Sequence, residues 1–410
     1  MIFEVNKLNW LYFDFDSYFA SVEQQLNPAL RGKPIVVVPM LSDSTCAIAA
    51  SYEAKKFGIQ TGAKIYEAKK LCPELICVPS NHSAYSRFHN LLINTINKQA
   101  YVDHVFSIDE GACKLTGKLQ ELENAKELAT KVKLAIKTDI GEFITCSIGI
   151  APSRFLAKIA SNIVKPNGVT VINTEEIKTV LCQLNLRDLP GIGRATFNKL
   201  SNANITSVQQ LYQLESGHLQ KLWGSVVGKR YWYYLRGVDI AKTKEKTITL
   251  GQSKVLSPKE RPVALSRNIV QKLILKAAKR LREKKLCTSK VALRIYDTSR
   301  NKFKESKKIP ALCDSRGLSS AVLSIWDELV YKYKINQVKK IAITFYNLAG
   351  ESPQLSLFDI RETKKQQTLS KIMDAINLKY NANVVTIGIK EVKKEEQEII
   401  AFKRIPITSQ

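Results

Sequence analysis

The order of predicted strands and helices constrains this chain most, because the same order occurs twice. Apolar runs alternate with segments of helical periodicity and predict β-α-β-β-α-β in both halves of the chain. The first copy comprises residues 8–16, 83–100, 105–116, 122–137 and 144–150, with residues 18–80 inserted in its first crossover. The second comprises residues 250–256, 264–286, 290–298, 302–309, 319–333 and 339–347. Two ferredoxin-like patterns of this kind predict an α+β multidomain protein.

The segments between and after the two copies have different compositions. Residues 174–238 are predicted to be mostly helical, and residues 239–247 are polar and typical of a linker. Within the first copy, residues 105–116 are predicted to form a hairpin with its turn at Asp109-Glu110-Gly111. After residue 349 the only clear signal is a helical stretch over residues 368–380.

The charge of the chain is strongly basic and unevenly distributed. The sequence has 63 Lys and Arg against 37 Asp and Glu, a formal net charge of +26. Residues 240–316 contain 22 Lys and Arg against 6 Asp and Glu, a net charge of +16 in under a fifth of the chain. Such a local concentration favours a polyanionic partner, with nucleic acid first, over a mere solubility excess.

Cysteine usage and hydropathy exclude several classes of protein. None of the eight cysteines forms a CxxC pair and there are only four histidines, so a zinc site is not expected and the thiols should be reduced. No run of about 18 uncharged apolar residues occurs. Acidic residues follow the N-terminus too closely for a signal peptide. We therefore expect a cytoplasmic protein with no membrane partner that is a monomer in isolation.

Acidic residues end two of the predicted strands of the first copy. Asp14-Phe15-Asp16 closes the first strand, and Ser107-Ile108-Asp109-Glu110 occurs at the hairpin. In a ferredoxin-like sheet the first and third strands are neighbours, so these carboxylates can converge. Clustered carboxylates need cations, and Mg²⁺ prefers hard oxygen ligands that it shares with phosphate. For either motif alone, the simpler interpretation is a turn or helix-capping residue.

Several motifs together carry a family resemblance. The segments YFDFDSYFASVEQQ, SYEAKKFGI, SIDE, SIGIAPSRFLAKIAS and KPNG follow each other in that order. In this combination the chain resembles a Y-family (DinB/UmuC-type) translesion DNA polymerase over residues 8–350. The resemblance implies a right-hand polymerase with a ferredoxin-like palm, small fingers, a helical thumb and a little finger. The implied domains are residues 1–17 and 81–172 (palm), 18–80 (fingers), 173–238 (thumb), 239–247 (linker), 248–349 (little finger) and 350–410 (tail).

The resemblance also assigns a metal site. Asp14, Asp109 and Glu110 match the family's catalytic, metal-binding carboxylates, and Phe15 would offer its backbone carbonyl. Two Mg²⁺ ions are the implied cofactors. Asp16 is expected to be a structural or helix-capping residue.

A nucleotide site is implied next to these carboxylates. Phe19 matches the aromatic steric gate that excludes a ribose 2′-hydroxyl. Tyr52, Lys55 and Lys165 match residues that bind the incoming triphosphate, in keeping with the affinity of phenols and ammonium groups for phosphate oxygens.

Three positions depart from the family pattern. Ala49 stands where many relatives have threonine, and Lys55 where many have arginine, which removes bidentate phosphate binding there. The stretch from Gly111 to Lys114 is less apolar and less acidic than usual. These departures concern nucleotide affinity and efficiency rather than metal chemistry.

Further residues are expected to contact DNA. Leu189-Pro-Gly-Ile-Gly-Arg194 is typical of a helix-hairpin-helix turn, whose glycines let the backbone approach a phosphate, so Gly191, Gly193 and Arg194 are candidates. An ordinary helix–helix turn is the alternative. In the second copy the candidate contacts on predicted strands are Lys254, Lys290, Arg294, Lys302 and Lys304.

The tail contains a short motif that resembles the bacterial sliding-clamp-binding pentapeptide. It comprises Gln354, Leu355, Ser356, Leu357 and Phe358, and Pro353 before it discourages a helix. The implied partners of the chain are primer–template DNA, a dNTP and a sliding clamp. The tail beyond is similar to UmuC-type members, whereas KPNG and DFDSYF are more DinB-like.

The sequence thus predicts a low-fidelity, template-directed DNA polymerase that bypasses lesions by transfer of a nucleotide to a primer 3′-hydroxyl. Two alternatives remain at this stage. One is a catalytically weak or inactive DNA-binding scaffold of the same family, recruited by a clamp. The other is a metal-dependent nuclease, which also uses three carboxylates; the steric-gate segment and KPNG disfavour it.

Overall fold

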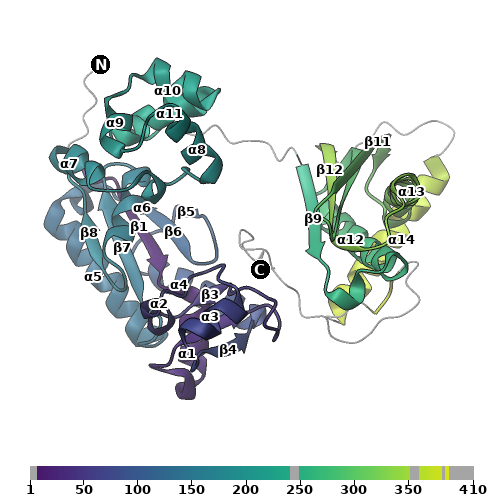
Figure 1. Ribbon diagram of the computed structural model, residues 1–410, viewed down its shortest axis with the longest axis horizontal. Coiled ribbons are helices and arrows are strands. Elements are labelled where there is room, and N and C mark those ends of the chain that lie inside the picture. Colours follow the sequence, from purple (N-terminus) through teal and green to yellow (C-terminus); the bar gives the residue numbers. More distant parts are fainter. Residues whose placement is uncertain (1–6, 241–248, 351–359, 381–383, 387–410) are drawn as a thin grey trace. The chain divides into compact units, whose positions relative to one another are not determined.

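The computed structural model describes residues 7–240, 249–350, 360–380 and 384–386, which belong to two compact units. The first unit extends to Ala241, and the second covers Lys242–Glu396. The units share no β-sheet: the first contains two sheets and the second contains one (Figure 1). Each unit also has buried core residues of its own. The expectation of an α+β multidomain fold is confirmed. No described helix is long and apolar enough to cross a membrane.

The main sheet of the first unit has the strand order β5-β6-β1-β7-β8. Its strands are β1 (Trp10–Phe15), β5 (His104–Val105), β6 (Glu110–Lys114), β7 (Cys146–Ala151) and β8 (Val169–Val171). β1 is antiparallel to both β6 and β7, so the first strand of the chain lies inside the sheet. β5, β6, β1 and β7 have the ferredoxin-like order, and β8 adds a parallel edge strand beside β7.

The hairpin between β5 and β6 corrects one sequence prediction. We expected the turn at Asp109-Glu110-Gly111, but Glu110 and Gly111 already belong to β6 and pair with β1. The turn lies earlier, where the Phe106 N–H donates to the carbonyl of Glu110 at 3.0 Å. Glycine and acidic residues are common in turns. Here the hydrogen bonds of the β1 ladder outweigh that local preference.

Strand alternation divides the side chains of β1 between two faces of the sheet. Leu11, Phe13 and Phe15 share a buried core with α4 (His82–Asn97) and α5 (Leu122–Asp139). Trp10 and Tyr12 share another with α6 (Arg154–Ile163). Asp14, two residues after Tyr12, therefore lies on the α6 face.

Gly149 in β7 lets α6 approach the sheet closely. A Cβ at this position would lie 2.0 Å from the carbonyl oxygen of Ala157 on α6. Contacts that short do not occur between real atoms, so any larger residue would push α6 outward. The close approach determines how near the side chains of α6 come to the carboxylates.

Smaller elements lie at the two ends of the main sheet (Figure 1). At one end, β2 (Ile35–Val38), β3 (Ala49–Ala50) and β4 (Ile76–Pro79) form a second sheet beside α1 (Tyr18–Leu26), α2 (Tyr52–Lys56) and α3 (Ile65–Leu71). At the other end lie the short helices α8 (Arg194–Asn202), α9 (Val208–Gln213), α10 (Ser216–Trp223) and α11 (Val226–Leu235), with α7 (Ile177–Cys182) before them in the chain. The mostly helical character predicted for residues 174–238 agrees with this.

The second unit is a four-stranded antiparallel sheet with the order β11-β10-β12-β9. Its strands are β9 (Thr249–Val255), β10 (Leu286–Asp297), β11 (Lys302–Leu312) and β12 (Val338–Gly350). The helices α12 (Val263–Glu283) and α13 (Ser315–Tyr333) share a core with one face. The elements follow the predicted order along the chain, but the last strand lies inside the sheet and the first lies at its edge.

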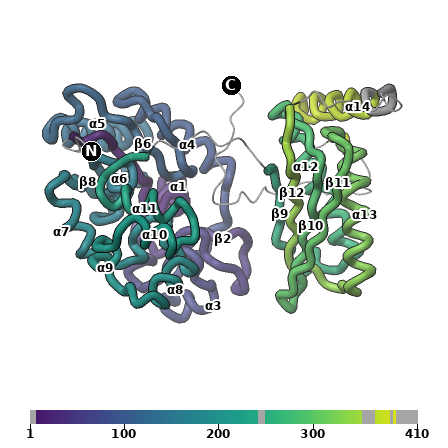
Figure 2. The backbone as a smooth tube through the Cα atoms, turned by 90° about the horizontal axis from the view of Figure 1, so that it is seen from above, coloured from purple at the N-terminus to yellow at the C-terminus, as the bar shows by residue number. Residues whose placement is uncertain are grey.

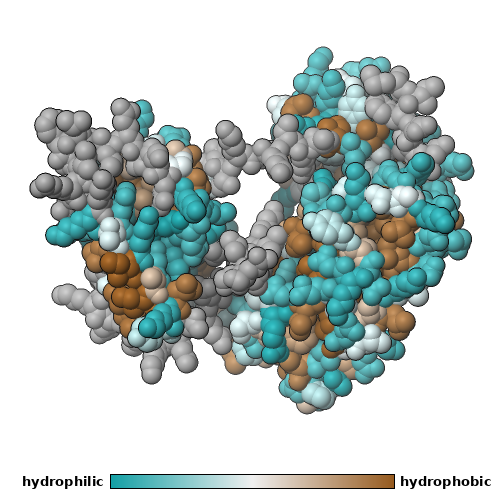
Figure 3. Space-filling model, turned by 180° about the vertical axis from the view of Figure 1, so that it is seen from behind, coloured by the Kyte–Doolittle hydropathy of each residue, from teal (hydrophilic) through white to brown (hydrophobic). Residues whose placement is uncertain are grey.

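A further helix, α14 (Ile360–Lys379), belongs to the second unit and begins earlier than the predicted residues 368–380 (Figure 2). Arg282 at the end of α12 forms two hydrogen bonds with the Asp374 carboxylate, at 2.7 and 2.9 Å. The Ser315 N–H donates to the Ser370 hydroxyl at 3.0 Å. Residues 354–358, the predicted clamp motif, lie outside the described residues. On the face drawn in Figure 3, hydrophilic and hydrophobic residues are intermixed on the surface of both units.

Candidate active site

Three carboxylates come together where β1 ends. Asp14 and Glu110 lie opposite each other on the adjacent strands β1 and β6. The Phe15 N–H donates to the backbone carbonyl of Asp109 at 2.8 Å, which holds Asp109 beside the end of β1. The Ser107 hydroxyl donates to the Asp109 carboxylate at 2.5 Å. The structure thus brings together the three carboxylates that the sequence singled out.

Two lysines pair with these carboxylates. Lys165 lies 2.5 Å from an oxygen of Asp14, and Lys158 lies 2.5 Å from an oxygen of Glu110. Lys165 was predicted as a site residue, whereas Lys158 was missed, because only the packing of α6 against the sheet brings it there. Within the described ranges, no group of three or more His, Cys, Asp or Glu side chains has an arrangement that would hold a metal ion. The lysines neutralise the carboxylates instead.

The protonation of Asp14 reflects this crowding. Burial raises the pKa of Asp14 to about 6, the Lys165 ammonium opposes the rise, and the charges of Asp109 and Glu110 add to it. The ionised form of Asp14 therefore has a higher free energy, relative to the protonated form, in the folded protein than in water. A divalent cation would relieve that cost.

Asp16 differs from the other carboxylates. Its side chain is 1% exposed and accepts four hydrogen bonds. The donors are the hydroxyls of Tyr52 (3.2 Å), Thr145 (3.0 Å) and Ser147 (2.8 Å) and the backbone N–H of Asn167 (2.8 Å). A buried carboxylate so fully satisfied is structural, as the sequence led us to expect.

The predicted triphosphate residues gather on one side of the carboxylates. The Lys55 ammonium lies 4.2 Å from the ring centroid of Tyr52, whose hydroxyl binds Asp16. Burial lowers the pKa of Lys55, and the charge of Lys165 lowers it further. The ammonium groups of Lys55 and Lys165 repel each other, and burial weakens their hydration. An anion bound between them would reduce this repulsion. Ala49 lies buried in β3 close by in the chain and offers no hydroxyl.

Phe19 lies half-buried near the start of α1. Its ring stacks on that of Tyr85 with centroids 4.3 Å apart and meets His82 edge-on at 6.4 Å. The neighbouring Tyr18 is buried and donates its hydroxyl proton to the backbone carbonyl of Tyr85 at 2.6 Å. Of these two adjacent aromatic residues, Phe19 is the one that retains an accessible surface.

Three family models match consecutive parts of the chain. The impB/mucB/samB family matches residues 13–162, and the impB/mucB/samB family C-terminal domain matches residues 249–357. Between them, the thumb domain of DNA polymerase-iota matches residues 187–239. The chain is 28% identical over 399 residues to DNA polymerase IV 1 of Bacillus subtilis, which covers 94% of each. It is 34% identical over 222 residues to DNA polymerase IV of Saccharolobus solfataricus, covering 53% of this chain and 62% of that one.

Solved structures agree with these similarities. The structure is similar to a Y-family DNA polymerase chimera of Dbh and Dpo4, with a TM-score of 0.72 and 27% identity over 83% of this chain and 99% of that one. The chain belongs to the Y family of DNA polymerases. This polymerase is of the DinB type and acts as a DNA-directed DNA polymerase. An insertion ternary complex of Dbh DNA polymerase gives a TM-score of 0.57 at 28% identity, with the same coverage.

The predicted helix-hairpin-helix of the polymerase precedes α8. Gly191 has a φ of 91°, a left-handed conformation that favours glycine. Gly193 is the residue before α8, and Arg194 is its first residue. The start of α8 has unpaired backbone N–H groups, as every helix start does, and phosphate binding there stays a prediction.

Four of the five predicted strand cations of the second unit share one face of its sheet. Arg294 on β10 lies opposite Lys304 on β11. Lys290 lies four residues before Arg294 and Lys302 two residues before Lys304, so these two lysines are on the same face. This is the face away from α12 and α13, because the alternate residues Val291, Leu293 and Ile295 are buried. Lys308 and Lys340 lie there too and were missed, since neither the register nor the face was known from sequence.

Lys254 corrects the prediction for the fifth cation. It lies opposite Ile341, whose side chain is in the core, so Lys254 is on the helix-covered face. Its ammonium lies 2.7 Å from the carboxylate of Glu260. In the structure Lys254 thus pairs with a carboxylate of its own unit, and its contact with DNA stays a prediction.

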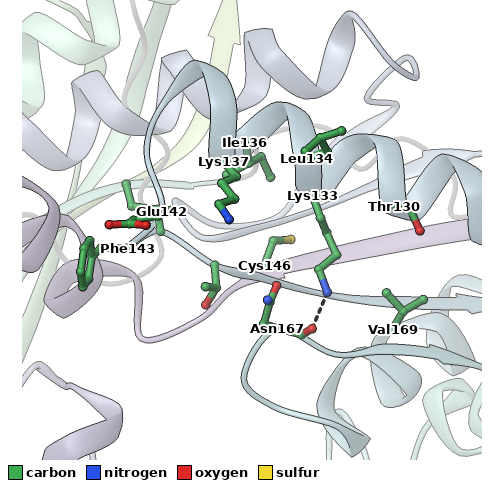
Figure 4. Close-up of a pocket in the computed structure, with 12 residues that line it drawn as sticks. Thr130, Lys133, Leu134, Ile136, Lys137, Glu142, Phe143, Cys146, Asn167 and Val169 are labelled. Atoms are coloured by element: carbon green, nitrogen blue, oxygen red, sulfur yellow. Dashed lines mark hydrogen bonds between the residues drawn. The ribbon is translucent and has the colours of Figure 1, made fainter. Parts of the chain in front are cut away.

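A cavity of about 570 Å³ is lined by α5, by residues 142–146 and by Asn167 and Val169 (Figure 4). Lys133 and Lys137 on α5 point toward it, and Lys133 donates a hydrogen bond to the backbone carbonyl of Asn167. Asn167 belongs to the loop that also carries Lys165. The three carboxylates lie outside the lining of this cavity, so it is separate from the candidate active site.

The raised pKa of Asp14 leads to a stability prediction. In the unfolded chain the carboxyl has an ordinary pKa of about 3.8, so folded-state stability falls as the pH rises from about 4 to about 6 and then stays lower. Asp14→Asn removes this cost, which is on the order of 2 kcal/mol. Above pH 7 and without divalent cations, we expect the variant to melt a few degrees above the wild type, with the difference shrinking toward pH 5. Thermal melts at several pH values measure this.

The matched control is Asp16→Asn, the same substitution two residues along the chain. It removes part of a four-bonded buried acceptor and should lower the melting temperature. Adding Mg²⁺ should stabilise the wild type but not Asp14→Asn. A melting temperature for Asp14→Asn below that of the wild type at pH 8 would contradict the interpretation of the site.

Proposed function

We propose that this polymerase extends a primer by two-metal nucleotidyl transfer and bypasses lesions with low fidelity. The observation that carries this is the convergence of Asp14, Asp109 and Glu110 at one strand end, with lysines on both sides of them. In this proposal residues 1–17 and 81–172 are the palm, 18–80 the fingers, 173–238 the thumb and 248–349 the little finger. Fingers of only three short strands and three helices would grip the new base pair loosely.

The chemistry of the donor set suits magnesium, but Asp14 and Glu110 would have to exchange their lysine partners for the metal, because their present arrangement forms no metal-binding group within the described residues. Three carboxylates and the backbone carbonyl of Phe15 are hard oxygen ligands, which Mg²⁺ prefers over nitrogen or sulfur. We propose that Asp14, Asp109 and Glu110 hold two ions together with this carbonyl. When bound, Mg²⁺ would supply Lewis-acid activation of the primer 3′-hydroxyl and charge neutralisation at the leaving group.

The residues of the chain itself would bind and orient the nucleotide. Lys165 and Lys55 would contact the phosphates of the dNTP, and the Tyr52 hydroxyl would add a hydrogen bond. Lys165 pairs with Asp14 in the structure. On substrate binding, phosphate oxygens would replace Asp14 as the partner of Lys165, and a metal ion would replace Lys165 as the partner of Asp14. The Phe19 ring, held by Tyr85, would pack against the sugar.

DNA would be held by both units. We propose that the N–H groups around Gly191 and Gly193, with Arg194, bind a backbone phosphate without reading bases. Lys290, Arg294, Lys302 and Lys304 on the open face of the second sheet would follow the backbone. Support comes from the one-sided arrangement of these cations and from the similarity to a polymerase in a ternary complex.

Replacing the carboxylates tests the catalytic assignment. Asp109→Ala or Glu110→Ala should reduce extension on undamaged and abasic templates by several orders of magnitude, because hard metal ligands are lost, while DNA binding persists. Single-turnover extension and fluorescence anisotropy measure the two quantities. Asp103→Ala, a substitution of an exposed aspartate on the same segment, serves as the control. Wild-type rates in either variant would refute the proposal.

The sugar-selection role of Phe19 is tested by Phe19→Ala. Removing the ring opens space beside the sugar C2′ atom, so incorporation of rNTP relative to dNTP should rise by roughly tenfold or more. Tyr18→Phe, which loses only the buried hydroxyl, is the control and should keep the wild-type ratio. An unchanged ratio in Phe19→Ala would mean that this ring only packs against Tyr85.

Recruitment by a sliding clamp is proposed through Gln354, Leu355, Ser356, Leu357 and Phe358. Apolar anchors in an extended segment fill pockets on a partner, and tethering raises the effective concentration of the polymerase on DNA. Leu357→Ala with Phe358→Ala should abolish clamp binding in surface plasmon resonance and clamp-stimulated synthesis. Extension of short primers without the clamp should stay at the wild-type rate. Wild-type clamp affinity in the double variant would rule out this motif as the anchor.

A further inference from the structure

Four aromatic rings form a continuous group beside the carboxylates, which we call the aromatic strip: Trp10, Tyr12, His104 and Phe106. Trp10 stacks with His104 at 5.8 Å between ring centroids, and Tyr12 with Phe106 at 5.5 Å and 8° between the planes. His104 and Phe106 also contact each other, at 5.8 Å. Trp10 and Tyr12 alternate along β1 with core residues and share the face of Asp14.

The strip has a buried layer and an exposed layer. Trp10 and Tyr12 are buried against the sheet, whereas Phe106 is 37% exposed and His104 is exposed. Phe106 directly precedes Ser107, which binds Asp109. The Phe106 ring contacts Tyr12 and His104 and still presents apolar surface near the carboxylates.

Two cations from α6 lie over the strip. The Arg154 guanidinium lies 5.5 Å from the Trp10 ring centroid and 5.3 Å from that of Phe106. The Lys158 ammonium lies 5.4 Å from the Tyr12 ring and pairs with Glu110. Asp239 accepts the Arg154 backbone N–H at 3.3 Å. Burial raises the pKa of Asp239, and this hydrogen bond and the charge of Arg154 oppose the rise.

The spacing of these cations suits one nucleic acid strand. Arg154 and Lys158 are four residues apart on α6, which is one helical turn and about 6 Å along its axis. Phosphates of one strand follow each other every ~3.4 Å along a duplex axis, so two cations about 6 Å apart match phosphates one or two positions apart on that strand. Of the two cations, Lys158 is the one that reaches the carboxylates, where it pairs with Glu110. Lys55 and Tyr52 lie on the other side of the carboxylates.

We propose that the aromatic strip, with Arg154 and Lys158, holds the last two nucleotides of the primer strand. Arg154 binds the backbone phosphate farther from the 3′ end, Lys158 binds the one nearer to it, and the Phe106 and His104 rings pack against the sugars. The primer is the strand whose end must reach the carboxylates, whereas the template continues past them. This inference rests on the proposed polymerase function and adds a positioning surface to it.

The test combines a protein variant with an uncharged phosphate. Arg154→Gln in the full chain should weaken binding of a primer–template with a recessed 3′ end by roughly tenfold. It should also lower the slope of log K against log[salt] by about 1, because one fewer counterion is released. Replacing single primer phosphates near the 3′ end by methylphosphonates should weaken wild-type binding at one position but leave Arg154→Gln unaffected there. That loss of additivity identifies the contact.

Arg87→Gln is the matched control, because Arg87 also lies over an aromatic ring, Phe88, but on α4 at the other face of the sheet. It should keep the wild-type affinity and salt slope. Arg154→Lys keeps the charge and should restore much of the coupling. Phe106→Ala should weaken binding of the same DNA without changing the salt slope, because it removes no charge.

The outcomes separate the two proposals. Additive effects of Arg154→Gln and every primer methylphosphonate overturn the inference, and so does coupling to a template phosphate instead. If the wild type extends primers but shows no coupling, only the primer-holding role fails. If it shows the coupling but does not extend primers, the proposed catalytic function fails while the binding surface stands.

Discussion

The buried carboxylate of Asp16 connects the parts of the candidate active site that distant segments of the chain supply. It accepts hydrogen bonds from Tyr52 on α2, from Thr145 and Ser147 at the start of β7, and from Asn167 in the loop after α6. Burying a charge is costly unless it is fully hydrogen-bonded. Moving any one donor away would leave the buried carboxylate short of a hydrogen bond and cost free energy, so each donor stays in place. The Tyr52 side chain and the loop of Lys165 are thereby fixed beside the end of β1.

Two lysines neutralise carboxylates of the candidate site, one from each side. Lys165 neutralises Asp14 from the side of Tyr52 and Lys55, and Lys158 neutralises Glu110 from the side of Arg154. Both lysines are also suited to bind phosphate. Burial raises the pKa of Asp14 even though Lys165 opposes the rise, so the ionised carboxylate is disfavoured at this place. The divalent cations and polyanions that we propose as ligands would stabilise this site, and a cost of this kind in the empty state is common for active sites.

The main sheet of the first unit and the sheet of the second unit are built from the same β-α-β-β-α-β order along the chain, but they carry different side chains. In the first unit the face without long helices carries carboxylates, aromatic rings and the closely packed α6. In the second unit the corresponding open face carries Lys290, Arg294, Lys302 and Lys304. The first unit places reactive groups at the end of an inner strand, where the sheet is most rigid. The second spreads cations over a surface, which suits contact with a regular backbone more than chemistry.

The sequence by itself determined the order of strands and helices, the basic second half and the carboxylates at the strand ends. These follow from local hydrophobic periodicity, composition and the residue types beside a strand terminus, to which the family motifs added the nucleotide residues. It misplaced the β5–β6 turn, it left open which sheet face Lys254 lies on, and it missed Lys158 and Arg154. Only the tertiary structure decided these points. A strand's register and face depend on hydrogen bonds to partners far along the chain, and the reach of α6 depends on how closely Gly149 lets it pack against the sheet.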